Sequence, residues 1–566
     1  MYAIIAFVPI LVTIVLMAVF NWPAKRALPL AWLLAVIFGI ALWKMSFIHA
    51  IGQTLTGFLG AFEVLVIIFG AILIMNTMQR SGAMDAINRM FNGLTPDARL
   101  QTVIIGFIFG AFIEGAAGFG TPAALAAPLM ISVGFPPLAA AIAALQLNSV
   151  PVPFGAVGTP TNMAFETVKD GLTLKDPNVW RMALTKWTAI PMSVGYFLIM
   201  IFTLAIICKM FGKERKMSDV LPAIPFIIYV GVVFDIFYIL IATVVGPELT
   251  SLIAAVLTLF IVMFTTKKGF LVPKKVWTFD KKENWEQSWL STTEVPEPKT
   301  SDMSLIKAWI PYFIIGIILV VTRVSEKMAS NAGNTNWATA MKNFKIGTGE
   351  SHIILGADWN WAIFWSPGVV FVVVALITFG LHGMKGEAIK GAFTDTFKML
   401  GGAAVALLFG VALVNIFRYT NIDSANMTNV AEAVKDSMLL VMAKALAGVF
   451  KSAYIIIAPI IAVLGTFMSG SNTVSNTLFA SLQFETAKLV GMPTVLIVAL
   501  QNMGGGIGNM TCVNNIVAAT ATTGTIGTEG KIMRTNALPM IAYSVLMVIV
   551  IFLVMMIIGD PMAGIT

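Results

Sequence analysis

Side chains that hold metals or act as nucleophiles are scarce in this chain. Its 566 residues include two cysteines, Cys208 and Cys512, which lie far apart and lack the spacing of a metal or redox motif. The three histidines, His49, His352 and His382, lie in or beside expected loops, so no histidine cluster or Ser–His pair is indicated. We therefore expect no metal, no cofactor, no structural disulfide and no enzyme activity.

Charge is also scarce. Charged residues make up 11% of the chain and hydrophobic residues 58%, with a mean hydropathy of +0.88. Soluble domains do not have this composition, whereas a bundle of roughly a dozen membrane-spanning helices does. The net charge of +8 comes from basic residues in short loops between apolar runs, which is typical of cytoplasmic loops and not of nucleic-acid binding. The sequence therefore predicts an all-α, multi-pass protein of the plasma membrane, with the lipid bilayer and no nucleic acid as a partner.

One long apolar stretch, residues 110–162, is interrupted by residues that break helices. Its only charged residue is Glu114, and it contains two Thr-Pro pairs and a Pro-x-Pro beside several glycines. Broken helices at membrane depth persist only inside protein or around a wet cavity, and they often mark a transport site. Close helix packing by small residues is the alternative, but it does not explain the prolines.

Short sequence pairs recur in the same order in the two halves of the chain. They are Phe69-Gly70 with Phe409-Gly410, Leu145-Gln146 with Leu500-Gln501, and Ala189–Met192 with Ala537–Met540. We therefore expect two transmembrane repeats, residues 1–212 and 305–566, each with about five transmembrane helices, a re-entrant hairpin and a broken helix. Two linker helices are expected within residues 213–266, and a cytoplasmic polar linker over residues 267–304.

Loop charge sets the expected orientation of the repeats. If the N-terminus lies outside, the basic loops at Lys25, Arg80–Arg99 and Lys213–Lys216 fall inside. The number of membrane crossings then agrees with the side assigned to each loop only if residues 102–133 and 455–489 do not cross the membrane but form re-entrant hairpins. This arrangement predicts inverted topology for the two repeats, with both chain ends outside.

The hairpin tips and helix breaks supply the candidate substrate site. Helix N-termini there present free N–H groups and a positive dipole end, which suit a small carboxylate. For each Thr or Asn, helix capping is the alternative role. The candidate substrate-binding residues are Gly118, Gly120, Thr121, Asn148, Thr159, Thr161, Asn162, Ser471, Asn472, Thr473, Asn502 and Asn509.

Three acids at membrane depth, Glu63, Glu114 and Asp235, are the candidates for proton coupling. An intramembrane carboxylate is costly and is usually functional, although each could instead form a structural ion pair or hydrogen bond. Apart from Lys488, neither interrupted segment contains Arg or Lys. Because no cationic clamp is evident, a substrate with one carboxylate is favoured over a dicarboxylate or a phosphate.

The interrupted segments also resemble a known family. EGAAGFGTPAALAAPLM, starting at Glu114, and LQLNSVPVPFGAVGTPTN, ending at Asn162, are similar to the signature region of the L-lactate permeases. The downstream SGSNTVSNT and GGGIGNM segments fit the family as well. The resemblance implies a bacterial inner-membrane secondary transporter that imports lactate or glycolate with protons by alternating access.

Several alternatives stay open at this point. A sodium-coupled carboxylate carrier of the wider ion-transporter superfamily is one, because tips rich in Asn, Thr and carbonyl groups also suit sodium. An anion channel is another, since loops lined by carbonyl groups also build filters. The preferred 2-hydroxy acid, its stereochemistry and the oligomeric state, with a homo-oligomer among the options, are not determined by the sequence.

Overall fold

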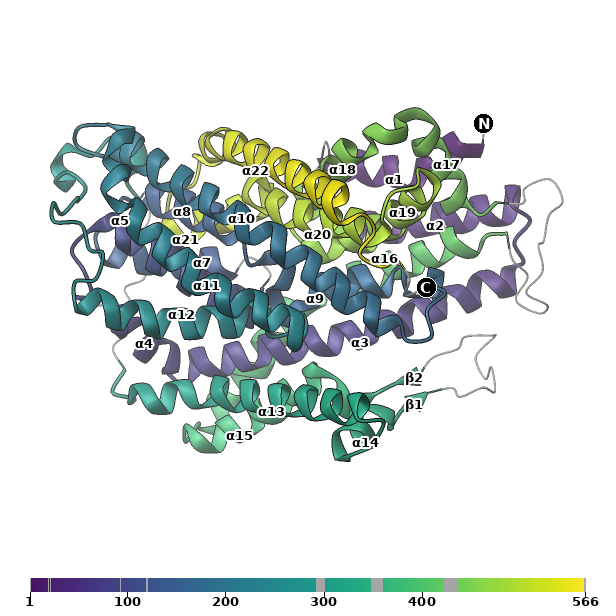
Figure 1. Ribbon diagram of the computed structural model, residues 1–566, viewed down its shortest axis with the longest axis horizontal. Helices are drawn as coiled ribbons and strands as arrows, with labels where there is room; N and C mark the ends of the chain where they lie inside the picture. The colour runs from purple at the N-terminus through teal and green to yellow at the C-terminus, as the bar shows by residue number, and fades with distance from the viewer. Residues whose placement is uncertain are drawn as a thin grey trace.

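The computed structural model describes residues 2–18, 20, 22–91, 93–118, 121–291, 301–347, 360–421 and 436–563. These residues form an almost entirely helical protein (Figure 1), with one two-stranded antiparallel pair, β1 (Ile346–Gly347) and β2 (Asn360–Trp361). Within the described ranges, ten helices are long and apolar enough to cross a membrane. The count rises to eleven if a pair bent by 65° at residues 149–151 is taken as one span. The predicted all-α, multi-pass fold is confirmed.

The elements of the first half include three short α-helices, a π-helical segment and several 3₁₀ turns between the longer helices. They are α1 (Tyr2–Ala18), α2 (Ala24–Leu42), α3 (Phe47–Arg80), α4 (Ala83–Asn88), η1 (Arg89–Phe91), α5 (Ala98–Gln101), the π-helical η2 (Thr102–Phe109), α6 (Gly110–Ala116), α7 (Thr121–Ser132), α8 (Pro137–Asn148), η3 (Val152–Phe154), α9 (Gly155–Glu166), η4 (Lys169–Gly171) and α10 (Pro177–Phe211).

The remaining elements begin with the two expected linker helices. They are η5 (Met217–Ala223), α11 (Ile224–Val244), α12 (Thr250–Lys267), η6 (Lys282–Asn284), η7 (Gln287–Trp289), α13 (Leu305–Asn331), α14 (Trp337–Asn343), η9 (Ile363–Trp365), α15 (Pro367–Leu381), α16 (Gly386–Tyr419), α17 (Met438–Phe450), η10 (Lys451–Ala453), α18 (Tyr454–Ser469), α19 (Asn472–Leu489), α20 (Thr494–Gly508), η11 (Asn509–Thr511), α21 (Val513–Thr523) and α22 (Glu529–Ile558).

The order of elements repeats between the halves. A helical hairpin (α5 to α7), a broken helix (α8 and α9) and a long helix (α10) follow one another, and α18/α19, α20/α21 and α22 follow in the same order. The long helices α3 and α16, which pack against each other, have 34 residues each. The order of elements is that of the predicted repeat. Figure 1 draws both chain ends in its right-hand half. The inverted orientation of the repeats stays a prediction.

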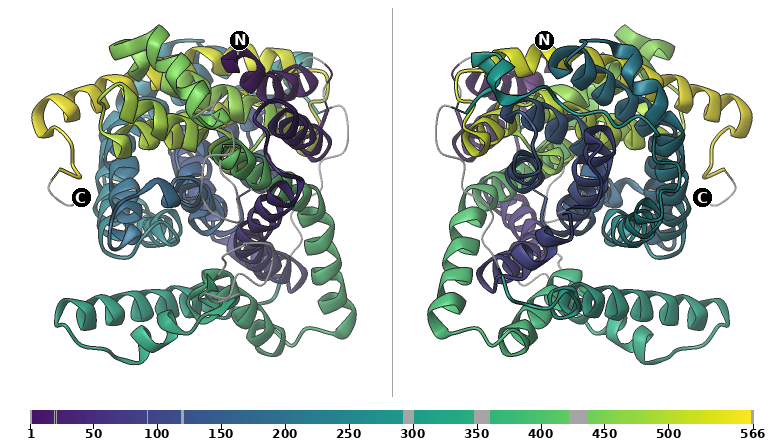
Figure 2. Two further views of the ribbon diagram at one scale, coloured as in Figure 1. Left: turned by 90° about the vertical axis from the view of Figure 1, so that its right-hand side faces the viewer. Right: turned by 90° about the vertical axis from the view of Figure 1, so that its left-hand side faces the viewer.

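The two halves share a core. The first two helices contribute Ile10 and Leu28 to a cluster with Leu413 of α16, Met438 of α17 and Leu478 of α19. Seen from the ends in Figure 2, α1 and α2 accordingly lie with the C-terminal elements. The expected boundaries between the repeats therefore do not separate two independently packed domains.

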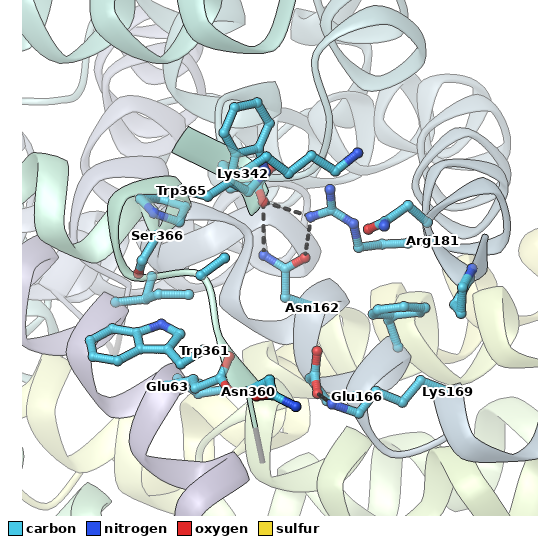
Figure 3. Close-up of a pocket in the computed structure, with 18 of the residues that line it drawn as sticks. Glu63, Asn162, Glu166, Lys169, Arg181, Lys342, Asn360, Trp361, Trp365 and Ser366 are labelled. Atoms are coloured by element: carbon cyan, nitrogen blue, oxygen red, sulfur yellow. Dashed lines mark hydrogen bonds and ion pairs between the residues drawn. The ribbon is translucent and has the colours of Figure 1, made fainter. Parts of the chain in front are cut away.

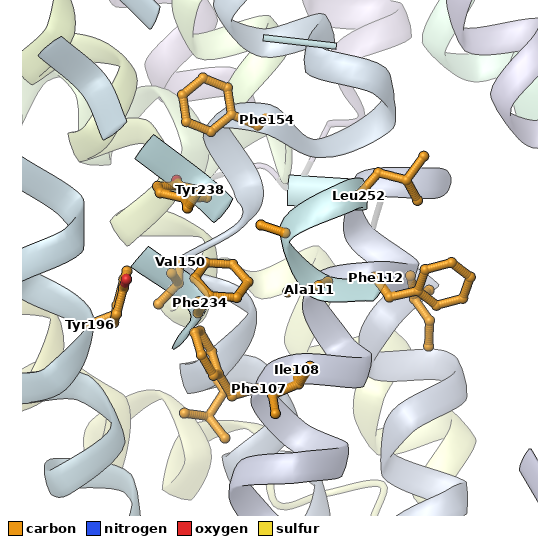
Figure 4. Packing of buried hydrophobic residues seen from close by; sticks show 14 of the residues in the cluster. Phe107, Ile108, Ala111, Phe112, Val150, Phe154, Tyr196, Phe234, Tyr238 and Leu252 are labelled. Atoms are coloured by element: carbon orange, nitrogen blue, oxygen red, sulfur yellow. The ribbon is translucent and has the colours of Figure 1, made fainter. Parts of the chain in front are cut away.

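Aromatic side chains fix the linker helices onto the first hairpin (Figure 4). The rings of Phe107 on η2 and Phe234 on α11 lie 4.9 Å apart, and those of Phe154 on η3 and Tyr238 on α11 lie 5.5 Å apart. Such ring pairs stabilise packing beyond the area that they bury. The first hairpin is thus held by α11 as well as by its own repeat.

The polar linker is packed against the helices as far as it is described. Trp289 is 4% exposed and lies in a cluster with Leu138 of α8, Phe211 of α10 and Ile516 of α21. The buried carboxylate of Asp97 accepts a hydrogen bond from the backbone N–H of Trp277, 3.1 Å away. The linker therefore covers the ends of broken helices from both halves.

Candidate functional site

Segments from both halves of the chain meet at one narrow cavity. From the first half it is lined by Glu114 and Gly118 of the hairpin and by Val152, Gly155, Ala156 and Pro160 around the helix break. From the second half it is lined by residues 470–473 and Asn509. Its volume, about 20 Å³, is room for about one water molecule. Among the described residues that line it, none is Lys or Arg. We call this space the narrow cavity.

Among the described residues that line the narrow cavity, Glu114 carries the only acidic group. Its side chain is 3% exposed, and within the described residues Oε2 has no hydrogen-bond partner. The Asn148 side chain is hydrogen-bonded to this carboxyl group. A Cβ atom on Gly155 would overlap Oε1 of Glu114, so the acid lies directly on the backbone of the broken helix. The π-helical η2 precedes this part of the hairpin, and such segments occur often at functional sites.

The first broken helix contains a left-handed turn. Ala156, Val157 and Gly158 have φ values of 41°, 58° and 69°. A β-branched residue rarely adopts this conformation, which costs of order 1–3 kcal/mol per residue and persists only where the surroundings enforce it. Close packing around the turn supplies that constraint. A Cβ atom on Gly158 would lie 2.5 Å from the Pro247 carbonyl carbon, and one on Gly118 would lie 2.9 Å from Cβ of Ala156, so neighbouring segments leave no room for another conformation.

The second hairpin turns at the opposite wall. Helix α18 ends at Gly470, whose φ is +75°, and the Ser471 hydroxyl caps α19 by accepting from the N–H of Val474 at 3.4 Å. The first-turn N–H groups of α19 have no intrahelical acceptor and carry the positive end of the helix dipole. Oδ1 of Asn472 is buried with no partner in the described part of the chain. This wall therefore offers N–H donors, while Oδ1 of Asn472 lies against Gly505 of α20 (Thr494–Gly508).

A buried amide network stands behind the narrow cavity. Oδ1 of Asn502 accepts from Nδ2 of Asn472 at 3.1 Å and from Nδ2 of Asn476 at 2.8 Å. Its own amide group donates to the hydroxyls of Thr161 at 2.8 Å and Thr188 at 3.3 Å. Asn502 thus joins the second hairpin to the first broken helix and to α10. It holds these segments in place and does not line the narrow cavity.

The structure brings together about half of the residues expected at the site. Those that line the narrow cavity are Glu114, Gly118, Ser471, Asn472, Thr473 and Asn509, and Asn148 contacts it through Glu114. The hydroxyls of Thr159 and Thr161 donate to the backbone carbonyls of Ala156 and Pro153. Both side chains therefore stabilise the break in the helix and do not line the narrow cavity. Gly120 lies outside the described residues, as does the side chain of Thr121, which begins α7.

The other two acids lie elsewhere. Asp235 is on the outer face of α11, where its carboxylate accepts a hydrogen bond from the Tyr196 hydroxyl and its neighbours Val232 and Ile236 are exposed. Glu63 lines a second space of about 420 Å³, which also contains Asn162. We call this space, bounded by α3, α9, α10, α13 and the segment 360–367, the wide cavity (Figure 3).

A closed polar triad forms one wall of the wide cavity. Arg181 donates to Glu248 at 2.8 Å and to Oδ1 of Asn162 at 3.1 Å, and Asn162 donates to Glu248 at 3.4 Å. Burial alone would raise the pKa of Glu248, but the guanidinium groups of Arg181 and Arg323 hold that pKa below its ordinary value. The triad ties α9 to α10 and to the turn between α11 and α12. The triad could not be predicted from the sequence, because Arg181 in α10 and Glu248 in the turn after α11 lie far apart along the chain; the position of Glu248 between two apolar runs was the available signal.

Known proteins are similar to this chain over most of its length. The sequence profile described as L-lactate permease matches residues 2–558. A putative L-lactate permease of Haemophilus influenzae is 29% identical over 96% of this chain and 96% of its own. The glycolate permease GlcA of Escherichia coli (strain K12) is 26% identical, over 94% of this chain and 92% of its own.

Among solved structures, the YdaH transporter of Alcanivorax borkumensis matches with 14% identity and a TM-score of 0.42, covering 89% of this chain and 87% of that one. That likeness is too weak to transfer any feature. The profile match over nearly the whole sequence, together with the apolar helices of the fold, decides the assignment. The chain belongs to the L-lactate permease family and is a multi-pass transporter of the bacterial inner membrane.

Proposed function

We propose that this protein imports a small 2-hydroxy monocarboxylate, lactate or glycolate, by proton symport with alternating access. The observation that carries the proposal is the meeting of Glu114 with the N-terminus of α19 across the narrow cavity. The helix N-terminus suits one carboxylate, and Ser471 and Asn472 suit a neighbouring hydroxyl group. The absence of Lys and Arg from the described lining disfavours a doubly charged substrate. The names of the relatives, L-lactate and glycolate permease, support the same substrate class.

Glu114 is the proposed proton carrier. A carboxyl group buried without a cation is most stable when it is neutral. A substrate carboxylate bound at the α19 N-terminus would lie across the narrow cavity from Glu114, and two adjacent carboxylates repel each other. Substrate binding and protonation of Glu114 therefore favour one another, which couples their transport. Glu63 and Asp235 do not line this cavity, which makes them weaker candidates.

Alternating access is supported by the size of the two cavities. The narrow cavity is too small for lactate in this conformation, so its walls have to move before substrate can bind. Helix α9 contributes to both cavities, through Gly155 to Pro160 at the narrow one and through Asn162 to Glu166 at the wide one. A rearrangement of this broken helix would therefore connect them. Two inverted repeats, residues 1–212 and 305–566, joined by linker helices within 213–266 and the polar linker 267–304, are the proposed framework for this motion.

Sodium coupling is the second candidate. The free acceptor on Asn472, close to the helix breaks, favours it because amide and carbonyl oxygens bind hard cations. The two ions are separated by measuring uptake of labelled lactate into proteoliposomes with an imposed pH gradient or an imposed sodium gradient. Accumulation driven by the pH gradient in sodium-free buffer is expected. Accumulation that needs sodium would refute proton symport.

Substrate class and transport mode are tested in the same proteoliposomes. Unlabelled lactate trapped inside should drive counterflow of labelled lactate, which a channel cannot do. Glycolate should compete for uptake, and succinate and citrate should not. Equal competition by succinate would contradict the monocarboxylate assignment.

A further inference from the structure

Among the described residues that line the wide cavity, one buried cation, Arg323, has no carboxylate within ion-pair distance. Arg323 on α13 is 8% exposed; its guanidinium group stacks on the Trp365 ring, 3.8 Å from the centroid, and donates to the Trp365 carbonyl at 2.7 Å. Within the described residues no carboxylate lies within 4.0 Å of it. This hydrogen bond uses one of the five N–H donors of the side chain.

The other basic groups nearby are mostly neutralised. Lys169 pairs with Glu166 at 2.5 Å and Lys342 with Glu326 at 2.7 Å, and Lys345 lies at the exposed rim. Five basic and three acidic side chains line the wide cavity, and Glu326 pairs with one of the five from outside the lining, which leaves a net charge of +1. Glu248 acts on Arg323 only from beyond ion-pair distance, so an anion bound directly beside Arg323 would stabilise its buried charge further.

Arg181 is a second cation on the wall of the wide cavity. Its Nε is buried with no partner among the described residues, although its terminal nitrogen is bonded to Glu248 and Asn162. Figure 3 shows Arg181 and Asn162 facing the space bordered by Trp361 and Trp365. The volume of about 420 Å³ is in the range of small-molecule sites, and aromatic side chains beside a charged anchor are typical of such sites.

We propose that the wide cavity is a second, separate binding site for a small carboxylate, with Arg323 as its main anchor and Arg181 as a second donor. The choice of lactate as the ligand rests on the proposed function. A carboxylate here competes with Glu248 for Arg181 and so loosens the triad that holds α9. The site binds the anion one step before it reaches the narrow cavity, and α9 is the wall that separates the two positions.

Binding is measured by tryptophan fluorescence of the purified full-length protein in nanodiscs, titrated with lactate and with uncharged lactamide. Trp365 reports lactate binding directly because it stacks on Arg323. The Trp365→Phe variant shows how much of the fluorescence quenching comes from this ring. Saturable quenching by lactate but not by lactamide is expected. Arg323→Gln should weaken the affinity at least tenfold. Arg215→Gln is the matched control. Arg215 also lies over a tryptophan ring, 5.6 Å from the centroid of Trp289, but its side chain is exposed and does not line the wide cavity.

Two further variants keep the test decisive. Asn472→Ala should impair transport while leaving this fluorescence signal intact, which separates the two sites. If Arg323→Gln does not fold, Arg323→Lys replaces it, since an ammonium group cannot pair in a bidentate way and should bind lactate more weakly. Unchanged affinity in the Arg323 variant, or saturation by lactamide, overturns the second site. Lactate saturation that depends on Arg323 in a protein that transports no lactate would instead reject the proposed function alone.

Discussion

The carboxyl group of Glu114 lies against the Cα atom of Gly155, so the first hairpin and the first broken helix touch where a side chain cannot fit. We expect Gly155→Ala to slow lactate uptake at least tenfold, because the added methyl group displaces Glu114; overpacking costs about 1–3 kcal/mol. Uptake into proteoliposomes measures this. Gly448→Ala is the control, since Gly448 is helical and no atom lies within 4 Å of the added Cβ. Unimpaired transport in Gly155→Ala would show that this contact is dispensable.

Glu114→Gln should remove coupling without removing substrate movement. The neutral amide cannot release a proton, so accumulation driven by a pH gradient is lost while exchange of internal and external lactate persists. Asp235→Asn is the comparison, and because Asp235 lies on the outer face of α11 we expect its accumulation to remain. Accumulation by Glu114→Gln with an unchanged pH dependence would place the proton site elsewhere.

Asn502→Ala should lower stability as well as transport. It removes the side-chain acceptor that the amide groups of Asn472 and Asn476 share and the donor to the hydroxyl of Thr161, and each of these hydrogen bonds contributes about 0.5–1.5 kcal/mol. The midpoint of thermal unfolding, followed by size-exclusion chromatography, should fall. Thr243→Ala should leave it unchanged, because that hydroxyl bonds only to carbonyls of its own helix. An unfolding midpoint equal to that of the wild type would mean that the network contributes little.

The ion pair in the triad of the wide cavity should persist at mildly acidic pH. The pKa of Glu248 is lower in the folded protein than in the unfolded chain, so its ion pair stabilises the fold above the unfolded pKa and is lost only as the pH falls through the folded pKa. The stability difference between wild type and Glu248→Gln should therefore stay constant from pH 8 to about pH 5 and shrink at lower pH. Thermal unfolding across this range measures it. A difference that vanishes between pH 7 and 6 would contradict the assigned shift.

Topology can be tested by cysteine labelling, because both native cysteines are buried. A membrane-impermeant maleimide should label Asp560→Cys in right-side-out vesicles, and Lys213→Cys only after the membrane is opened. Both positions are exposed on the protein. Labelling of position 560 from the cytoplasmic side alone would reject the predicted inverted arrangement.

The tips and breaks could be located from the sequence because helix-breaking residues stand out in an apolar background. Glu114, Gly118 and the Ser471–Thr473 segment lie in such places, and they meet in the structure. The left-handed turn at Ala156 and Val157 could not be predicted, since neither residue favours that conformation and only tertiary packing enforces it. The wide cavity could not be predicted either, because Arg181 and Arg323 lie far apart along the chain and no sequence pattern links them.

The buried position of Trp289 has a kinetic consequence. The polar linker crosses the ends of α8, α21 and α22 through this side chain, so any passage opened on that side has to displace an indole ring from its apolar cluster. Burying a large apolar side chain contributes roughly 1.5–3 kcal/mol, and the same amount opposes its release. Any opening that separates this cluster therefore has to release Trp289, a residue that lines neither the narrow nor the wide cavity.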